Sequence, residues 1–282
     1  MNSMRDNFNP TSGLRSGYGL RLHTRLAIWG IPLLLVVFGT RASGKVIVVS
    51  TTIQAAVDAA EPGDTVQIPQ GTYRENVVVT KNNITINASA GAVLDGTGLG
   101  GNTGIKVAPS DSANRISGFV LSGLTIQNFS RNGVFLRNTD NFRITGGTYL
   151  DNDEYGIFPV QSSRGLIDHN YVSGSDDTGI YVGQSHDILV KKNRAVDCTV
   201  GIEIEVSSHI DVRNNTANGN TIGLVVQVLP GLSVAVTSDI KITGNKLIGN
   251  NRANPVTDPR RVAVEASEWH RLPECRRRSS DR

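Results

Sequence analysis

Apolar residues recur at every second position in short runs between positions 133 and 226, and one phrase returns five times. Gly133-Val134-Phe135-Leu136 shows the phrase, in which a glycine precedes alternating inward and outward positions. A fixed period, in a unit too short for paired helices, predicts a β-solenoid with one coil per repeat. The five leading glycines lie 22 or 23 residues apart, at Gly133, Gly156, Gly179, Gly201 and Gly223.

The alternation predicts three columns of side chains that face the interior and stack from coil to coil. Two columns lie on the glycine-led strand and one on a second strand. Pro159 lacks a backbone donor in mid-strand, so we expect a bulge there. The columns are Val134, Ile157, Ile180, Ile202 and Leu224; Leu136, Pro159, Val182, Ile204 and Val226; and Ile144, Ile167, Val190, Val212 and Ile242.

Asparagines recur at the turns, where they tolerate left-handed geometry and hydrogen-bond along the axis. We expect one ladder of Asn170, Asn193, Asn215 and Asn245, the last after an eight-residue insertion around 229–236. A second ladder comprises Asn128, Asn152, Asn220 and Asn250, with Ser175 and Cys198 between them. Cys198 is then a small buried filler, and two cysteines give no disulfide framework.

The N-terminal part of the repeat region predicts a strand at 45–50 and a short helix at 51–60. Thr51 or Thr52 would cap this helix, and Pro62-Gly63 would end it. Such a helix covers the open end of a solenoid. The fold class is therefore all-β, a parallel β-helix over residues 43–251 with a short N-terminal capping helix.

The two ends of the chain differ from the repeats. Arg15, Arg21 and Arg25 precede the apolar run Leu26–Phe38, which predicts a signal peptide over 1–42 and export to the periplasm, the cell surface or the medium. An uncleaved anchor is the alternative; after cleavage we expect no membrane span. Residues 252–282 carry eight arginines and no repeat, and we expect a disordered tail or a truncated or shifted reading frame. We interpret this charge as a solvated tail and expect no nucleic-acid partner.

Residues 46–251 resemble the right-handed parallel β-helix (pectin-lyase-like) superfamily of pectate lyases, pectin methylesterases and polygalacturonases. The segments Asp176–Ser185 and Gly201–Glu205 are most similar to bacterial exported parallel β-helix repeat proteins of unassigned activity. Ile167-Asp168-His169-Asn170 resembles a pectate-lyase phrase, and 152–156 followed by Asp176-Asp177 resembles acidic coils of polygalacturonases. The other catalytic segments of these enzymes have no counterpart here, so the resemblance implies the fold and no particular reaction.

Outward positions of the glycine-led strand form two further columns. Stacked aromatic rings beside polar groups suit sugars, so this face predicts polysaccharide as the partner. Gly183 should leave a dip in the face. The predicted substrate-binding residues are Phe135, Arg137, Phe158, Tyr181, Glu205 and Gln227.

Carboxylates before and on this strand are the catalytic candidates: Asp153, Glu154, Asp176, Asp177 and Glu203. Two carboxyls on neighbouring coils suit a glycoside hydrolase. A lyase or epimerase would use Ca²⁺ at Asp153, Asp176 and Asp177. Asp-Asp before Thr-Gly is also ordinary turn chemistry, so no metal or cofactor is assigned. The first hypothesis is an exported protein that recognises polysaccharide; the alternatives are a carbohydrate-active enzyme and a structural or surface scaffold.

Overall fold

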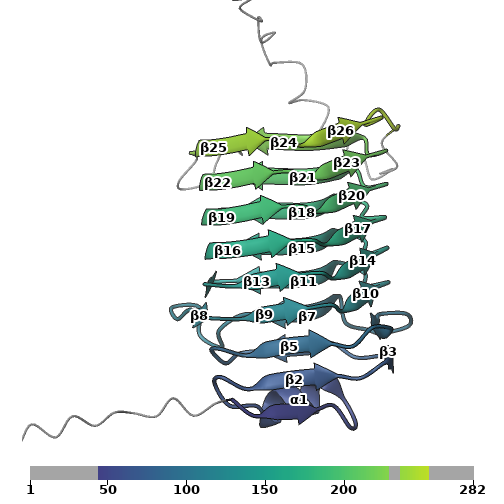
Figure 1. Ribbon diagram of the computed structural model, residues 1–282, viewed down its shortest axis with the longest axis vertical. Coiled ribbons are helices and arrows are strands. Elements are labelled where there is room, and N and C mark those ends of the chain that lie inside the picture. The colour runs from purple at the N-terminus through teal and green to yellow at the C-terminus, as the bar shows by residue number, and fades with distance from the viewer. Residues whose placement is uncertain (1–43, 229–235, 254–282) are drawn as a thin grey trace, which may run out of the picture. The chain divides into compact units, whose positions relative to one another are not determined.

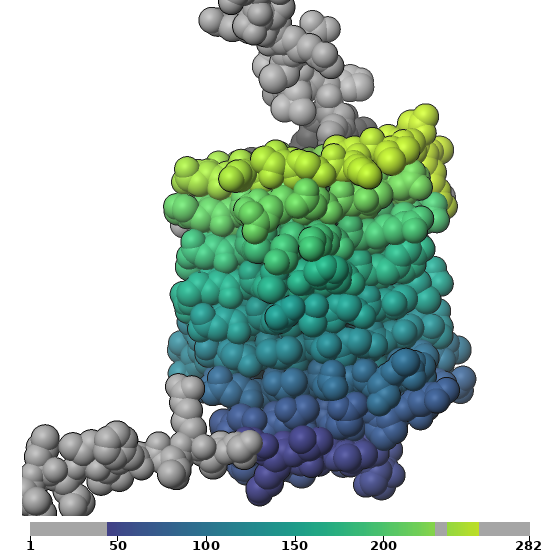
Figure 2. All heavy atoms as spheres, viewed as in Figure 1, coloured from purple at the N-terminus to yellow at the C-terminus, as the bar shows by residue number. Residues whose placement is uncertain are grey.

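The computed structural model describes residues 44–228 and 236–253, which form 26 strands and one helix (Figure 1). All strand pairs are parallel, and each coil contributes strands to three sheets that run along the solenoid. Successive coils follow one another as bands of colour in the space-filling view (Figure 2). The predicted parallel solenoid is therefore confirmed.

The three sheets are named A, B and C. Sheet A contains β1 (Val46–Val48), β2 (Thr65–Ile68), β5 (Thr85–Ala88), β8 (Ile116–Ser117), β9 (Val120–Ser122), β12 (Thr139–Asp140), β13 (Arg143–Thr145), β16 (Ser163–Asp168), β19 (His186–Lys191), β22 (Ser208–Arg213) and β25 (Ser238–Thr243). Sheet B contains β3 (Gly71–Tyr73), β6 (Ala92–Asp95), β10 (Thr125–Gln127), β14 (Thr148–Leu150), β17 (Tyr171–Ser173), β20 (Arg194–Val196), β23 (Thr216–Asn218) and β26 (Lys246–Ile248). Sheet C contains β4 (Val77–Val79), β7 (Thr103–Val107), β11 (Asn132–Arg137), β15 (Tyr155–Val160), β18 (Thr178–Gly183), β21 (Val200–Glu205) and β24 (Ile222–Gln227).

The predicted capping helix is α1 (Ile53–Ala59), which lies at the N-terminal end of the solenoid (Figure 1). Thr52 is its N-cap, and its Oγ1 accepts a hydrogen bond from the Ala55 backbone N at 3.1 Å. The Glu75 carboxylate accepts two more backbone N–H groups of the first turn, at 2.7 and 2.8 Å. These bonds satisfy donors that a helix leaves free at its N-terminus. The buried side chains of α1 join the solenoid core, so the helix closes this end.

The repeated glycines are required because consecutive coils approach closely at these positions. A Cβ on Gly133 would lie 2.7 Å from the Gly156 carbonyl oxygen, and one on Gly201 would lie 2.6 Å from that of Gly223. Gly104 makes the same approach to Gly133, at 2.7 Å, and so begins a sixth glycine-led coil. The longer spacing of 29 residues between Gly104 and Gly133 hides this coil from a search for the period.

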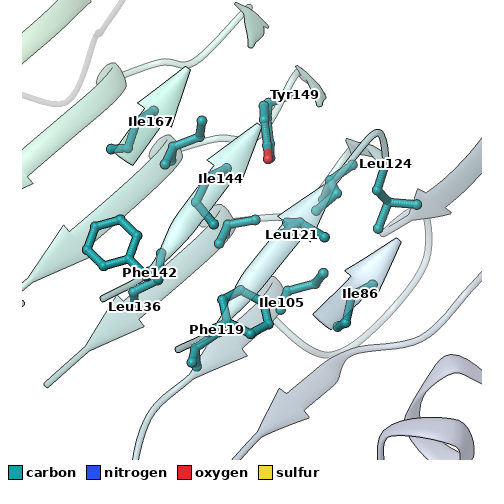
Figure 3. Packing of buried hydrophobic residues seen from close by; sticks show 14 of the residues in the cluster. Ile86, Ile105, Phe119, Leu121, Leu124, Leu136, Phe142, Ile144, Tyr149 and Ile167 are labelled. Carbon is teal, nitrogen blue, oxygen red and sulfur yellow. The ribbon is translucent and has the colours of Figure 1, made fainter. Parts of the chain in front are cut away.

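The inward columns form a continuous core of aliphatic side chains, as predicted. Phe119, Phe142 and Tyr149 add buried aromatic rings among them (Figure 3). Two residues that we predicted to be buried are exposed: Val226 by 37% and Ile242 by 45%. Both belong to the last coil of the described residues, where no further described coil stacks on them.

The first asparagine ladder is confirmed by its hydrogen bonds. The Asn170 Nδ2 donates to Asn193 Oδ1 at 3.0 Å, and the Asn193 Nδ2 donates to Asn215 Oδ1 at 3.0 Å. Each Nδ2 also donates to a carbonyl oxygen, as Asn193 does to Ile167 at 2.9 Å. The ladder thus satisfies backbone groups at a buried turn, where an unpaired group would be costly.

The second ladder needs one correction. Asn152 Oδ1 accepts from the backbone N of Phe129 at 3.2 Å, so Phe129 and not Asn128 precedes it in the column. Asn128 has a left-handed φ of 61° and donates to Asp95 instead, at 2.9 Å. Phe129 lies 23 residues before Asn152, the same interval as from Asn152 to Ser175, whereas Asn128 lies 24 residues before Asn152. Cys198 is fully buried in the column, and burial raises the pKa of its thiol to about 11.

The bulge predicted at Pro159 is absent. Ile157 pairs with Ile180 and Val160 pairs with Gly183, so the offset is 23 residues on both sides of the proline. No residue is inserted, because strand β15 keeps this register with β11 as well.

The predicted signal peptide and nearly all of the predicted basic tail lie outside the described residues, and export therefore stays a prediction. Within 44–228 and 236–253 no helix is long and apolar enough to cross a membrane.

We expect Asn193→Ala to destabilise the fold by about 2–4 kcal/mol, because Asn170 and the Ile167 carbonyl would lose buried partners. Urea unfolding measures this change. Asn114→Ala is the matched control, since Asn114 is exposed and forms no side-chain hydrogen bond within the described residues. Equal effects of the two substitutions would contradict the role of the ladder.

Candidate functional site

The outer face of sheet C carries the predicted site residues in register. Lys106, Phe135 and Phe158 are neighbours on β7, β11 and β15, and Tyr181, Glu203 and Val225 follow on β18, β21 and β24. A second column contains Arg137, Val160, Gly183, Glu205 and Gln227. The predicted columns are therefore present, and Lys106 extends the first of them by one coil.

Four aromatic rings gather on this face, and three of them were predicted. Phe135 and Phe158 have ring centroids 5.2 Å apart, and Phe158 and Tyr181 are separated by 4.7 Å. The fourth ring, Tyr155, stacks on Tyr181 at 5.0 Å with an interplanar angle of 21° and lies 4.6 Å from Phe158. We call these four residues the aromatic cluster. Each such pair adds about 0.5–1.5 kcal/mol beyond area burial.

Tyr155 was missed because simple alternation fails at the leading glycine. A Cβ on Gly156 would point inward, 2.7 Å from the Gly179 carbonyl oxygen. The next residue, Ile157, also faces the core, so two consecutive positions are inward. Two successive inward positions leave Tyr155 on the outside, where its ring meets Phe158 and Tyr181. Strict period-2 alternation would have placed it inside.

The dip predicted at Gly183 is filled by the Tyr181 ring. A Cβ on Gly183 would lie 3.1 Å from both Cζ and Oη of Tyr181. The missing side chain therefore lets the ring fold down along its own strand, and Tyr181 is 8% exposed. The exposed part of the aromatic cluster is formed by Phe135, Tyr155 and Phe158, which are half-buried.

The two tyrosine hydroxyls are hydrogen-bonded to carboxylates of the following coils, Tyr155 to Asp177 and Tyr181 to Glu205. Burial raises the pKa of both hydroxyls, and the nearby negative charges raise it further. Both tyrosines are therefore donors at every physiological pH. The arrangement ties the aromatic cluster to the acidic coils.

Glu203 is the central carboxyl of this region and is 6% exposed. Its Oε2 accepts from Thr178 Oγ1 at 2.6 Å, and its Oε1 accepts from Gln227 Nε2 at 2.6 Å. Burial raises the pKa of Glu203 to about 8; the charges of Asp177 and Glu205 add to the shift, and both hydrogen bonds oppose it. Glu203 is thus mainly protonated at neutral pH.

The other predicted catalytic residues are arranged differently. Asp153 and Asp176 are exposed, and their turns are joined by a backbone hydrogen bond from Asp176 N to Asp153 O at 3.1 Å. Glu154 forms an ion pair with Arg131 at 2.8 Å. No group of three or more acidic, histidine or cysteine side chains within the described residues is arranged to hold a metal ion. Calcium at Asp153, Asp176 and Asp177 stays a prediction.

A pocket of about 470 Å³ opens beside Phe135 and Phe158 on strands β7, β11 and β15. Arg137 was the only polar residue of its lining that we predicted. The other polar lining residues belong to the longer coil before Gly133 or to turns, which carry no repeat signal. They are Asn102, Thr103, Lys106, Arg131, Asn132 and Gln161, and Val160 completes the lining.

Residues 103–266 match the family described as the right handed beta helix region, and the chain belongs to this family. The match covers more than half of the 282 residues and establishes the hand of the solenoid. It agrees with the pectin-lyase-like resemblance of the sequence. No curated protein matches the sequence at a significant level.

Three solved structures share the solenoid. The alginate lyase from Paenibacillus sp. str. FPU-7 is 19% identical, with a TM-score of 0.52 over 73% of this chain and 97% of the lyase. DFA-IIIase from Arthrobacter chlorophenolicus A6, without its lid and in complex with GF2, is 14% identical, with a TM-score of 0.56 over 76% and 74%. The tailspike protein of E. coli bacteriophage HK620, in complex with a pentasaccharide, is 12% identical, with a TM-score of 0.50 over 71% and 47%.

At such identities the likeness shows the fold alone. The chain also spans only 46% of another match, the ORF18 protein of Geobacillus virus E2.

We expect Glu203→Gln to flatten the dependence of stability on pH. The folded state holds the Glu203 proton up to about pH 8, whereas the unfolded chain releases it near the ordinary value of 4.5. The stabilisation by this proton is therefore complete below pH 4.5 and lost as the pH rises to 8. Glutamine stays neutral, so the variant should gain on the order of 3 kcal/mol over the wild type between pH 5 and pH 9.

Urea unfolding at pH 5, 7 and 9 measures this difference. Glu61→Gln is the control, because Glu61 is an exposed carboxylate away from sheet C. Parallel pH profiles for the wild type and Glu203→Gln would show that the carboxyl ionises normally.

Proposed function

We propose that the outer face of sheet C binds polysaccharide. The observation that carries the proposal is the aromatic cluster, whose rings span three adjacent coils at centroid distances of 4.6–5.2 Å. Half-buried rings keep one apolar surface free for the apolar face of a sugar, and the polar groups beside them serve the sugar hydroxyls. Repetition of the coil extends this surface along the axis, as a polymer requires.

Two of the structural neighbours support the proposal because they act on or bind saccharides. One is an alginate lyase, and another is a tailspike in complex with a pentasaccharide. Parallel solenoids of this kind therefore carry saccharide sites on other chains. The residues that would do so here are the members of the aromatic cluster.

The proposal is tested with the full chain by isothermal titration calorimetry against alginate, polygalacturonate, inulin and dextran. We expect at least one of them to bind, and Phe158→Ala to weaken that binding about tenfold, because Phe158 contacts the three other rings. Tyr171→Ala is the matched control, since Tyr171 is a half-buried aromatic residue on sheet B.

A wild type that binds none of these polymers would remove the proposal and leave the scaffold interpretation. Equal losses in Phe158→Ala and Tyr171→Ala would place the binding elsewhere.

A second candidate function is cleavage of a glycosidic bond, which is favoured by the protonated state of Glu203. A buried carboxyl that keeps its proton at neutral pH can donate it to a leaving oxygen, and a neighbouring carboxylate such as Asp177 or Glu205 can supply the base. In this scheme Thr178 and Gln227 orient Glu203.

Under this second candidate we expect any reducing-end release from a bound polymer to fall at least 100-fold in Glu203→Gln and in Asp177→Asn, because general acid–base catalysis contributes roughly that much. A reducing-sugar assay measures hydrolysis, and absorbance of unsaturated products would reveal a lyase instead. Binding without turnover in the wild type would leave recognition as the function.

A further inference from the structure

The pocket beside Phe135 has a strongly one-sided charge. Three of its lining residues are cationic, namely Lys106, Arg131 and Arg137, and none of the described residues that line it is acidic. The two lining rings, Phe135 and Phe158, belong to the aromatic cluster. The pocket therefore joins an aromatic surface to an excess of positive charge.

Two of the three cations are available to a ligand. Arg131 is paired with Glu154 at 2.8 Å. Neither Lys106 nor Arg137 forms an ion pair with any residue that the structure describes, and both are exposed. Arg137 is held by a hydrogen bond from its Nε to Gln161 Oε1 at 3.3 Å. This bond engages one edge of the guanidinium and leaves its terminal nitrogens as donors.

The register places both cations next to one ring, Lys106 along the solenoid axis and Arg137 along the strand. Lys106 is the direct neighbour of Phe135 on the adjacent strand, about 4.8 Å away along the axis. Arg137 lies two residues after Phe135 on the same face, roughly 6.6 Å along the strand. Both charges are therefore within reach of the substituents of a single sugar ring that lies on Phe135.

We propose that this pocket is a subsite for an acidic sugar, one that bears a carboxylate or a sulfate group. The sugar ring would pack on Phe135 and Phe158, and its anionic group would lie between Lys106 and Arg137. The guanidinium fork suits the paired oxygens of such a group, and the lysine adds a mobile point charge. The inference rests on the proposed function and deepens it by naming the class of polysaccharide.

The opposite end of the face gives the polymer a direction. Asp177 lies just before β18 and Glu205 lies on β21, whereas the free cations lie on β7 and β11. A negative sugar is attracted to the first coils and repelled from the later ones. A single-stranded nucleic acid is negatively charged along its length as well, so oligo(dT) is included in the experiment.

The experiment compares polymers that share a sugar backbone and differ in charge, by calorimetry at low salt with the full chain. Polygalacturonate is paired with its methyl ester, and dextran sulfate is paired with dextran. We expect the wild type to prefer the charged member of at least one pair by tenfold or more. Preference within the first pair identifies a carboxylate as the ligand group, and preference within the second identifies a sulfate. The preference should decline as salt is added.

Variants of Lys106 and Arg137 test whether these two residues cause the preference for charged polymers. In the double variant Lys106→Ala/Arg137→Ala the ratio of charged to uncharged affinity should fall close to one. The charge-conserving Lys106→Arg/Arg137→Lys should keep most of the preference. Lys241→Ala, which removes an exposed lysine from sheet A, is the matched control and should change nothing. Both sites are exposed, and circular dichroism verifies that each variant folds.

Three outcomes would overturn the inference: no preference for charge in the wild type, an unchanged preference in the double alanine variant, or tighter binding of oligo(dT) than of either acidic polymer. These failures are distinguishable from failure of the proposed function. If an uncharged polymer binds and Phe158→Ala weakens it, the aromatic face binds saccharide although the acidic subsite is wrong.

Discussion

In-register stacking of parallel coils is the constraint on which the rest of this protein depends. Each coil must return to the same place one strand spacing higher, because only then do backbone hydrogen bonds and inward columns continue without interruption. Gly133 and its equivalents permit this close approach, since any Cβ would meet a carbonyl oxygen of the next coil. The asparagine ladder satisfies backbone groups at the buried turn of the coils that contain Asn170, Asn193, Asn215 and Asn245. Together these glycines and asparagines keep the coils aligned, and this alignment does not depend on the outward side chains.

The outward positions of the solenoid can vary in residue type, and this variation allows a binding site to form. Interior columns must be apolar and of matching size, whereas outward positions on sheet C tolerate a lysine, a phenylalanine and a glutamate in one column. Burying Glu203 raises its pKa and costs stability at neutral pH, and its hydrogen bonds with Thr178 and Gln227 on the two adjacent coils offset part of this cost. A buried ionisable group with a pKa shifted in this way is a candidate functional residue. Lys106 and Arg137 differ from Glu203, because they are exposed and no described residue neutralises their charges.

Much of the fold could be predicted from the sequence, because the period repeats the same physical requirement in every coil. The glycine column, the inward columns and the ladder through Asn193 all follow from that repetition, whereas the cap at Thr52 follows from the preference for threonine before a helix. Errors occurred where one coil departs from its neighbours. The coil that begins at Gly104 is 29 residues long, which hid Lys106. Asn128 was aligned one residue away from the true column.

The site was harder to predict, because its members do not share a period. Phe135, Phe158 and Tyr181 could be placed by alternation, but the glycine interrupts the alternation and brings Tyr155 outside with them. Whether an outward side chain is accessible depends on its neighbours in three dimensions, as the ring of Tyr181 over Gly183 shows. The outer face of a sheet therefore becomes a binding site where neighbouring coils carry different side chains that contact one another. In this protein the change from free cations on β7 and β11 to buried carboxyls on β21 is such a difference, and it gives an otherwise repetitive surface a direction.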